Sequence, residues 1–354
     1  KRIRNILLCI SIAFNLGMLF FFKYFNFFIE NVNTIFNISL NYVDVTLPLG
    51  ISFYTFQTMS YTIDVFLGKV KAEKNIINFG AFVCLFPQLI AGPIVKYTDI
   101  NEELRNRKIN LSQIQDGVQL FILGLASKVL IANNIGALWS EAENIGFGNI
   151  STILAWMIVI AFAFRIYFDF SGYSLMAIGL GKILGFNFPR NFNYPYISRS
   201  ITEFWRRWHI SLSSWFRDYI YIPLGGNRVS KLKWLRNILL VWLLTGIWHG
   251  AAWNFIFWGV YFGILLILEK VFLQKILEKI PTVLSRIYVL LIVMISFIIF
   301  SGEGVNQIIA NITGLVGIPN VALISNESIY YFKSYFIVIL MGIIGSTTIL
   351  KNIV

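Results

Sequence analysis

Long apolar runs alternate with short polar segments along the chain. Seven runs approach or exceed the roughly 20 residues that a helix needs to cross a bilayer, and they lie at 6–29, 46–68, 114–139, 151–184, 238–268, 285–302 and 329–350. This pattern predicts an all-α protein, a polytopic bundle of transmembrane helices. No repeat, low-complexity tract or linker divides the sequence, so we expect a single integral membrane domain over residues 1–354.

Two apolar regions do not fit a plain spanning helix. The run at 76–95 is interrupted by Pro87 and Pro93, which predicts a re-entrant or kinked element. The run at 238–268 has 31 residues without a formal charge, too long for one comfortable helix and short for two complete crossings. We expect a broken helix or a tight hairpin near Gly250.

The segment 199–227 predicts an amphipathic helix at the cytoplasmic membrane interface. Ser200 followed by Glu203 is typical of a capping box, and Pro223 ends the pattern. Steps of three and four place the apolar side chains on one face, and these are Ile201, Phe204, Trp205, Trp208, Leu212, Trp215, Phe216 and Tyr219. Polar residues fall on the other face, toward headgroups or a polar cavity, and these are Arg206, Ser213 and Arg217.

Charged residues are sorted by connecting segment. Segments 30–45, 140–150 and 303–328 contain no Lys or Arg and hold Glu30, Asp44, Glu141, Glu143, Glu303 and Glu327. Basic residues gather in segments 1–4, 69–74, 105–108, 190–236 and 270–286. The positive-inside rule places the basic segments in the cytoplasm and the acidic ones outside.

The composition agrees with a membrane protein. Hydrophobic residues make up 57% and charged residues 13% of the chain, whereas soluble domains have about 25% charged residues. The net charge of +12 follows the topology, so we expect contact with membrane lipid and no nucleic-acid partner. The sequence begins at Lys1, and we expect a fragment that lacks membrane helices at one or both ends.

Scarce cysteine and histidine narrow the possible chemistry. The two cysteines, Cys9 and Cys84, lie in apolar runs and indicate neither a disulfide framework nor a thiolate metal site. With only two histidines, a multi-histidine metal site is excluded, and we predict no metal and no bound cofactor. The sequence contains no nucleophile elbow, Walker loop or dinucleotide fingerprint.

The two histidines are the candidate proton-transfer groups. His249 lies in an uncharged apolar run, where an ionisable side chain is costly and indicates function. Burial favours the neutral imidazole, which can accept a proton from a hydroxyl. A structural histidine packed beside Trp248 and Trp253 is the alternative. His209 lies at the border of the two faces of 199–227 and could be a second acid or base, a donor ligand or a structural residue.

Other polar residues have simpler interpretations. Four arginines could bind donor phosphates through paired N–H groups, or lipid phosphate instead, and they are Arg206, Arg207, Arg217 and Arg228. Arg165 and Asp169, four residues apart on an apolar helix, predict a buried ion pair. Asp218 is expected to pair with a nearby arginine, and Ser171 and Ser174 to serve helix packing.

Several motifs resemble those of membrane-bound O-acyltransferases. The stretches FWRRWHISLSSWFRDYIYIPLGGNR (204–228) and LTGIWHGAAWNFIFWGVYFG (244–263) are most similar to the bacterial alginate and peptidoglycan O-acetyltransferases. Supporting stretches place the motif core at about 45–265, and they lie at 47–65, 86–97 and 166–201. The resemblance implies a helical bundle whose tunnel or funnels meet near the middle of the membrane.

The resemblance also implies roles for individual residues. His249 matches the family's catalytic histidine, and His209 matches the partner histidine of the WRRWH motif. We expect seven residues to contact the donor or substrate, and they are Trp205, Arg206, Arg207, Trp208, Arg217, Trp248 and Asn254.

The activity implied by the resemblance is acetyl transfer in a bacterial plasma membrane. Acetyl-CoA would be the cytoplasmic donor, and the acceptor would be hydroxyls of an extracytoplasmic alginate-, cellulose- or peptidoglycan-like polysaccharide. Relatives in this branch pass the acyl group to a separate extracytoplasmic SGNH-hydrolase-like protein.

Two alternatives stay open. Leu175 stands where the alginate branch usually has an acidic residue and where D-alanine-transferring relatives are apolar. Transfer of D-alanine from an acyl-carrier protein to teichoic acid is therefore the first alternative. A transporter or channel with broken helices is the second.

Overall fold

The computed structural model describes residues 2–90, 92–318 and 322–349, and these residues form helices and no strands. The predicted all-α fold is confirmed. Within the described residues, six helical stretches are long and apolar enough to cross a membrane, and they are Arg2–Phe36, Leu111–Glu141, Thr152–Ile183, Trp253–Leu277, Thr282–Ser301 and Asn326–Gly345. The last residue of the expected run 329–350 and the side chain of Glu143 lie outside the described part.

The helices follow in this order. The first group is α1 (Arg2–Leu19), the π-helical turn η1 (Phe20–Tyr24), α2 (Phe25–Phe36), α3 (Ile51–Phe66), α4 (Ile76–Cys84), α5 (Phe86–Leu89) and α6 (Tyr97–Arg105). The second is α7 (Leu111–Ala126), η2 (Ser127–Ala132), α8 (Asn133–Ile145), η3 (Phe147–Asn149), α9 (Thr152–Ile183) and η4 (Pro195–Ile197). The third is α10 (Ile201–Arg207), α11 (Ile210–Phe216), η5 (Arg217–Tyr221), α12 (Lys231–His249) and α13 (Trp253–Leu268). The last is η6 (Glu269–Leu273), α14 (Gln274–Leu277), α15 (Thr282–Ser301), α16 (Val305–Leu315) and α17 (Asn326–Gly345).

The predicted breaks in two apolar regions are confirmed. The run at 76–95 divides into α4, the short α5 and an extended segment, with Pro87 in the first turn of α5. The run at 238–268 divides into α12 and α13, which are joined by an extended Gly250 and pack against each other. The run at 46–68 forms only the 16 residues of α3, because Gly50 has a φ of +76° and stops helical geometry before Ile51.

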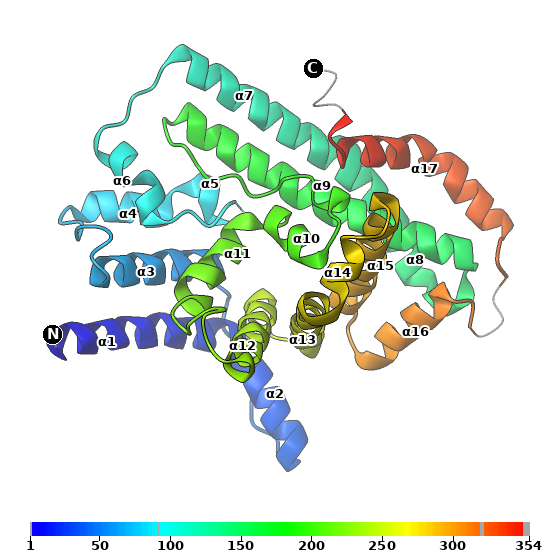
Figure 1. The fold of residues 1–354 in the computed structure, drawn as a ribbon, viewed down its shortest axis with the longest axis horizontal. Helices are drawn as coiled ribbons and strands as arrows, with labels where there is room; N and C mark the ends of the chain where they lie inside the picture. The colour runs from blue at the N-terminus through cyan, green and yellow to red at the C-terminus, as the bar shows by residue number, and fades with distance from the viewer. Residues whose placement is uncertain (1, 91, 319–321, 350–354) are drawn as a thin grey trace.

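The segment 199–227 is not one interfacial helix. It bends at His209 into α10 and α11, which lie in the middle of the bundle in Figure 1. The whole apolar stripe is buried inside the protein, with Trp215 only 2% exposed. Its rings pack on other helices, such as Trp205 on Trp242 of α12 and on Phe262 of α13. The amphipathic pattern therefore reflects packing in the protein core and not contact with lipid.

The start of α10 is capped from two sides. The Ser200 hydroxyl accepts the N–H of Glu203 at 3.0 Å, as the capping motif predicts. The Glu203 carboxylate, however, accepts the N–H of Arg199. Glu269 of η6, which is 2% exposed, accepts the N–H groups of Ile201 at 2.6 Å and of Thr202 at 2.9 Å. These bonds satisfy N–H groups that the first turn of a helix leaves free.

The expected ion pair between Arg165 and Asp169 is not formed. Asp169 of α9 pairs with Lys128 of η2, and the Arg165 side chain is exposed and packs against Gly136. The lysine on the neighbouring helix approaches the carboxylate more favourably than the residue one turn earlier on the same helix. The pair therefore joins two helices.

The long rod of α7, η2 and α8 packs along α9 (Figure 1). Glycines let the two backbones touch, as is common between membrane helices. A Cβ atom at Gly117 would lie 2.7 Å from the carbonyl oxygen of Gly179, and one at Gly172 would lie 2.7 Å from that of Gly124.

We therefore predict that Gly172→Ala destabilises the protein. Its methyl group would push α7 and α9 apart, at a cost of about 1–3 kcal/mol for overpacking. Thermal unfolding of the purified protein in detergent measures the effect. Gly17→Ala is the matched control, because nothing lies within 4 Å of a Cβ at Gly17, and it should leave the melting temperature unchanged or raise it. Equal melting temperatures for the two variants would contradict this account of the helix contact.

Candidate functional site

The two predicted histidines lie on the wall of one cavity of about 250 Å³. Trp248 contacts both imidazoles, with its ring centroid 6.1 Å from that of His209 and 5.2 Å from that of His249. The rest of the wall comes from distant parts of the chain, namely Lys23, Ser52, Phe53, Ile90 and Phe170.

The bend at His209 depends on Asn191, in the loop after α9. His209 has a φ of 43°, which is uncommon for a residue other than glycine. The main-chain carbonyl of Asn191 accepts the N–H of Ile210 at 2.9 Å. The side-chain Oδ1 of Asn191 accepts the Ser211 hydroxyl at 2.9 Å. A strained backbone that its surroundings hold in this way is frequent at functional sites.

Asn191 also sets the tautomer of His209. The imidazole Nδ1 lies 3.1 Å from Asn191 Oδ1, and the amide nitrogen donates to the Ser174 hydroxyl at 3.0 Å. Since an amide oxygen can only accept, we assign the proton to Nδ1, which leaves a lone pair on Nε2. The ring is 2% exposed, and Nε2 has no hydrogen-bond partner among the described residues.

His249 is the last residue of α12 and is held by aromatic packing. The rings of Trp258 and Phe300 lie nearly perpendicular to the imidazole, and their centroids are 4.9 Å and 5.4 Å from the imidazole centroid. Neither ring nitrogen of His249 makes a hydrogen bond within the described part of the chain. The arrangement therefore leaves both nitrogens available to a ligand while fixing the plane of the ring.

A slot with an apolar and a polar part lies on the side with basic segments. The apolar part, of about 220 Å³, reaches Thr245, one turn before His249 on α12, and is also lined by Trp205 and Arg217. The polar part, of about 500 Å³, is lined by basic and acidic groups, namely Arg199, Arg206, Glu203, Glu269 and Glu278. Thr202 and Lys270 line both parts, so the two are adjacent.

A hollow of about 430 Å³ lies on the other side of the α12–α13 turn. It is lined by Ala251, Asn254, Trp253 and the carboxylates Glu30 and Glu303. Trp253 is 53% exposed and packs on Phe257 at a ring distance of 6.0 Å. The topology expected from the charge pattern puts this hollow on the extracytoplasmic side of the membrane.

The other predicted site residues are dispersed. Asn254 lines the outer hollow and donates to the Phe300 carbonyl at 2.6 Å. Trp208 is buried among Tyr167, Phe204 and Phe297 and does not line the histidine cavity.

Two of the predicted arginines also lie away from the slot. Arg207 pairs with Glu203 at 2.8 Å and donates to the Asn193 carbonyl, so it ties α10 to the preceding loop. Arg228 is exposed and lines neither part of the slot.

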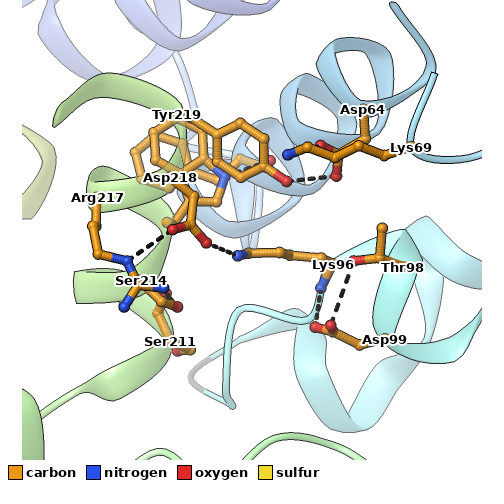
Figure 2. Close-up of polar contacts among 12 residues, drawn as sticks. Asp64, Lys69, Lys96, Thr98, Asp99, Ser211, Ser214, Arg217, Asp218 and Tyr219 are labelled. Carbon is orange, nitrogen blue, oxygen red and sulfur yellow. Dashed lines mark hydrogen bonds and ion pairs between the residues drawn. The ribbon is translucent and has the colours of Figure 1, made fainter. Parts of the chain in front are cut away.

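A polar network braces the inner side of the site (Figure 2). Asp218 accepts Lys96 at 2.6 Å and Arg217 at 2.8 Å, which confirms the expected arginine partner. Burial opposes ionisation of Asp218, but these hydrogen bonds outweigh it and place the pKa of the carboxyl below its ordinary value. Asp218 bonds only the Nε of Arg217. Among the described residues, the two terminal guanidinium nitrogens of Arg217 make no hydrogen bond, so they are available to a ligand.

Asp64 forms the second contact of this network (Figure 2). Its carboxylate is 1% exposed and accepts the Tyr219 hydroxyl at 2.6 Å and the Lys69 ammonium at 2.9 Å. These bonds join α3 to η5, directly beside the Asp218 contacts.

Comparison with known proteins identifies this architecture. The pattern of the membrane-bound O-acyltransferase family matches residues 69–310. The chain belongs to the membrane-bound O-acyltransferase family. It is therefore a multi-pass membrane protein, and the family resemblance of its motifs is confirmed. Both histidines lie within the matched residues.

Named bacterial relatives match most of this chain. It is 42% identical to a probable alginate O-acetylase of Azotobacter vinelandii, over 84% of this chain and 60% of the relative. It is 34% identical to a peptidoglycan O-acetyltransferase of Helicobacter pylori, over 90% of this chain and 66% of the relative. It is 31% identical to a teichoic acid D-alanyltransferase of Streptococcus thermophilus, over 64% of this chain and 58% of the relative. The chain thus spans about 60% of the length of the alginate O-acetylase it matches.

The sequence pattern missed two residues of the candidate site. Lys23 lies on the cavity wall, and its signal was a single charge inside the apolar run 6–29. Asn191 had no comparable signal, because its role depends on a backbone bend in a different segment.

The Asp64 contact makes a stability prediction. Asp64→Ala leaves the buried Tyr219 hydroxyl unpaired and should cost about 1–3 kcal/mol, read as a lower melting temperature in detergent. Asp116→Asn is the control, because Asp116 is 55% exposed and its pair with Lys182 lies at the surface. Exposed pairs contribute about 0–1 kcal/mol. If the two variants have the same melting temperature, the Asp64 contact does not stabilise the inner side of the site.

Proposed function

We propose that this protein transfers acetyl groups from acetyl-CoA in the cytoplasm to hydroxyls on the outer side of a bacterial plasma membrane. The observation that carries the proposal is the shared cavity of His209 and His249. Along the chain, His249 lies between Thr245, which lines the slot on the basic side, and Ala251, which lines the hollow on the acidic side. Family membership makes O-acyl transfer the reaction class, and the identity to named O-acetylases favours the acetyl group.

The slot fits a thioester donor with a long arm. A pantetheine-like arm is largely apolar and would occupy the part that reaches Thr245, whereas phosphates would stay in the polar part. Arg206 and Lys270 supply positive charge there, and Arg217 adds a guanidinium on the wall of the apolar part. Guanidinium groups bind phosphate through paired N–H donors.

The two histidines would divide the proton transfer. His249 accepts the proton of the attacking hydroxyl and returns it to the departing thiolate. His209, with its proton held on Nδ1 by Asn191, presents an Nε2 lone pair and orients the acceptor or donor. Aromatic walls keep water away from the thioester and so limit its hydrolysis.

The acceptor would arrive through the outer hollow. We propose an extracytoplasmic polysaccharide as the final acceptor, reached through an SGNH-hydrolase-like partner protein. The names of the alginate and peptidoglycan relatives support the polysaccharide, and Trp253 and Asn254 offer a stacking face and an amide at the entrance.

D-alanyl transfer has less support. Leu175, the residue that suggested it, lines a separate cavity of about 640 Å³ beside α17 and does not line the histidine cavity. The position of that side chain therefore lends no support to D-alanyl transfer. Binding of acetyl-CoA, compared with binding of an acylated carrier protein, separates the two donors. Transport remains the non-enzymatic alternative, and solute flux across proteoliposomes without acyl transfer would favour it.

The histidines provide the first test. We expect His249→Ala to abolish, and His209→Ala to reduce at least tenfold, the alkali-labile acetate on surface polysaccharide of cells that express the full-length protein with its neighbouring genes. Each variant is compared at matched membrane abundance, and Trp208→Phe serves as the control for disturbance of the aromatic core. Unchanged acetate in both histidine variants would overturn the proposed function.

The arginines of the slot provide the second test. Removing both Arg206 and Arg217 by alanine substitution should raise the acetyl-CoA KM about tenfold, which corresponds to about 1.4 kcal/mol, with little change in kcat. Lys231→Ala with Lys233→Ala removes two exposed charges from the start of α12 and is the charge-matched control. If both double variants shift KM equally, long-range attraction and not the slot binds the donor.

A further inference from the structure

Lys23 is a charged side chain in the middle of a membrane span. It belongs to the candidate span Arg2–Phe36 and lies in the π-helical turn η1. Ionisable residues inside spans are costly and usually face a functional interior. π-helical turns within α-helices are likewise frequent at functional sites.

The π-helical turn directs two side chains onto the end of α12. Lys23 Nζ donates to the carbonyl oxygen of Trp248, and the Tyr24 hydroxyl donates to that of Ile247 at 2.7 Å. The last four carbonyls of a helix have no partner within it. Lys23 and Tyr24 therefore cap the turn that ends at His249.

One N–H group of the Lys23 ammonium has no hydrogen-bond partner among the described residues. An ammonium group has three N–H donors and no acceptor. Trp248 takes one and the Ser52 hydroxyl, at 3.0 Å, takes another. Lys23 lines the histidine cavity, and among the described residues it is the one charged side chain on that wall.

We propose that Lys23 is a catalytic residue that stabilises the oxyanion formed during acyl transfer. This assignment rests on the proposed function. The acceptor oxygen bonds to the acetyl carbonyl carbon, the π electrons of that carbonyl move onto its oxygen, and the acceptor proton moves to His249. Lys23 donates its third N–H to the new oxyanion. The oxyanion then re-forms the carbonyl as the carbon–sulfur bond breaks, and the departing thiolate receives the proton from His249.

The physical basis is a fixed charge in a site of low polarity. The bonds to Trp248 and Ser52 hold the ammonium in place before reaction, so it needs no reorganisation as charge develops. Loss of one oxyanion donor commonly lowers kcat by about 10²–10³. Tyr24 shares the cap on α12 but does not line the cavity, which separates anchoring of His249 from chemistry.

The test compares Lys23 with Tyr24. Inside-out membrane vesicles from cells that express the full-length protein and its neighbouring genes receive radiolabelled acetyl-CoA, and the label in alkali-labile ester is measured. We expect Lys23→Met to lower the maximal rate about 100-fold with the acetyl-CoA KM within threefold of wild type. Lys23→Arg should restore part of the rate, and Tyr24→Phe should keep at least one third of it.

A second variant covers a folding defect in Lys23→Met. Lys23→Gln keeps an N–H donor for the Trp248 carbonyl but removes the charge, and it should still lose at least tenfold in rate. A full rate for Lys23→Gln, or equal losses for Lys23→Met and Tyr24→Phe, would overturn the assignment. If the wild type is active, His249→Ala is inactive and Lys23→Met keeps its activity, only the role of Lys23 is overturned. A wild type without labelled ester overturns the proposed function as well.

Discussion

Backbone groups that leave a helix inside a membrane protein must find a partner within the protein, because the bilayer interior offers none. This constraint organises the whole site. At the end of α12, Lys23 and Tyr24 donate hydrogen bonds to the free carbonyl groups. At the bend before α11, Asn191 receives the N–H of Ile210. Each break therefore requires a polar group from another segment.

The breaks also shape the cavity that the two histidines share. A continuous helix through residues 199–227 would have buried the His209 ring within a regular face, whereas the left-handed residue turns it toward Trp248 and the cavity. The extended Gly250 lets α13 return beside α12, so that Trp258 and Phe300 can clamp the His249 ring. Aromatic packing therefore holds the His249 ring in place, whereas a hydrogen bond to Asn191 holds the His209 ring.

Charge divides the site into two sides. The slot on the basic side is lined by four basic and three acidic residues, whereas the two charged residues that line the outer hollow, Glu30 and Glu303, are both acidic. This asymmetry has the sign of the rule that orients membrane proteins during insertion. Under the proposed function it suits an anionic donor on one side and an uncharged hydroxyl on the other. The Asp218 and Asp64 contacts brace the inner side without using the terminal nitrogens of Arg217.

The amino-acid sequence by itself determined the membrane bundle, the break near Gly250 and the choice of the two histidines, because hydrophobic runs, local breakers and rare residue types are all short-range signals. It misassigned Asp169 and the surroundings of 199–227, since periodicity shows that a face is apolar but not whether lipid or protein covers it. Only the tertiary structure decided that Lys23 meets Trp248, 225 positions away, and that Asn191 holds His209. Such pairings depend on how helices pack, and local sequence carries no record of the partner.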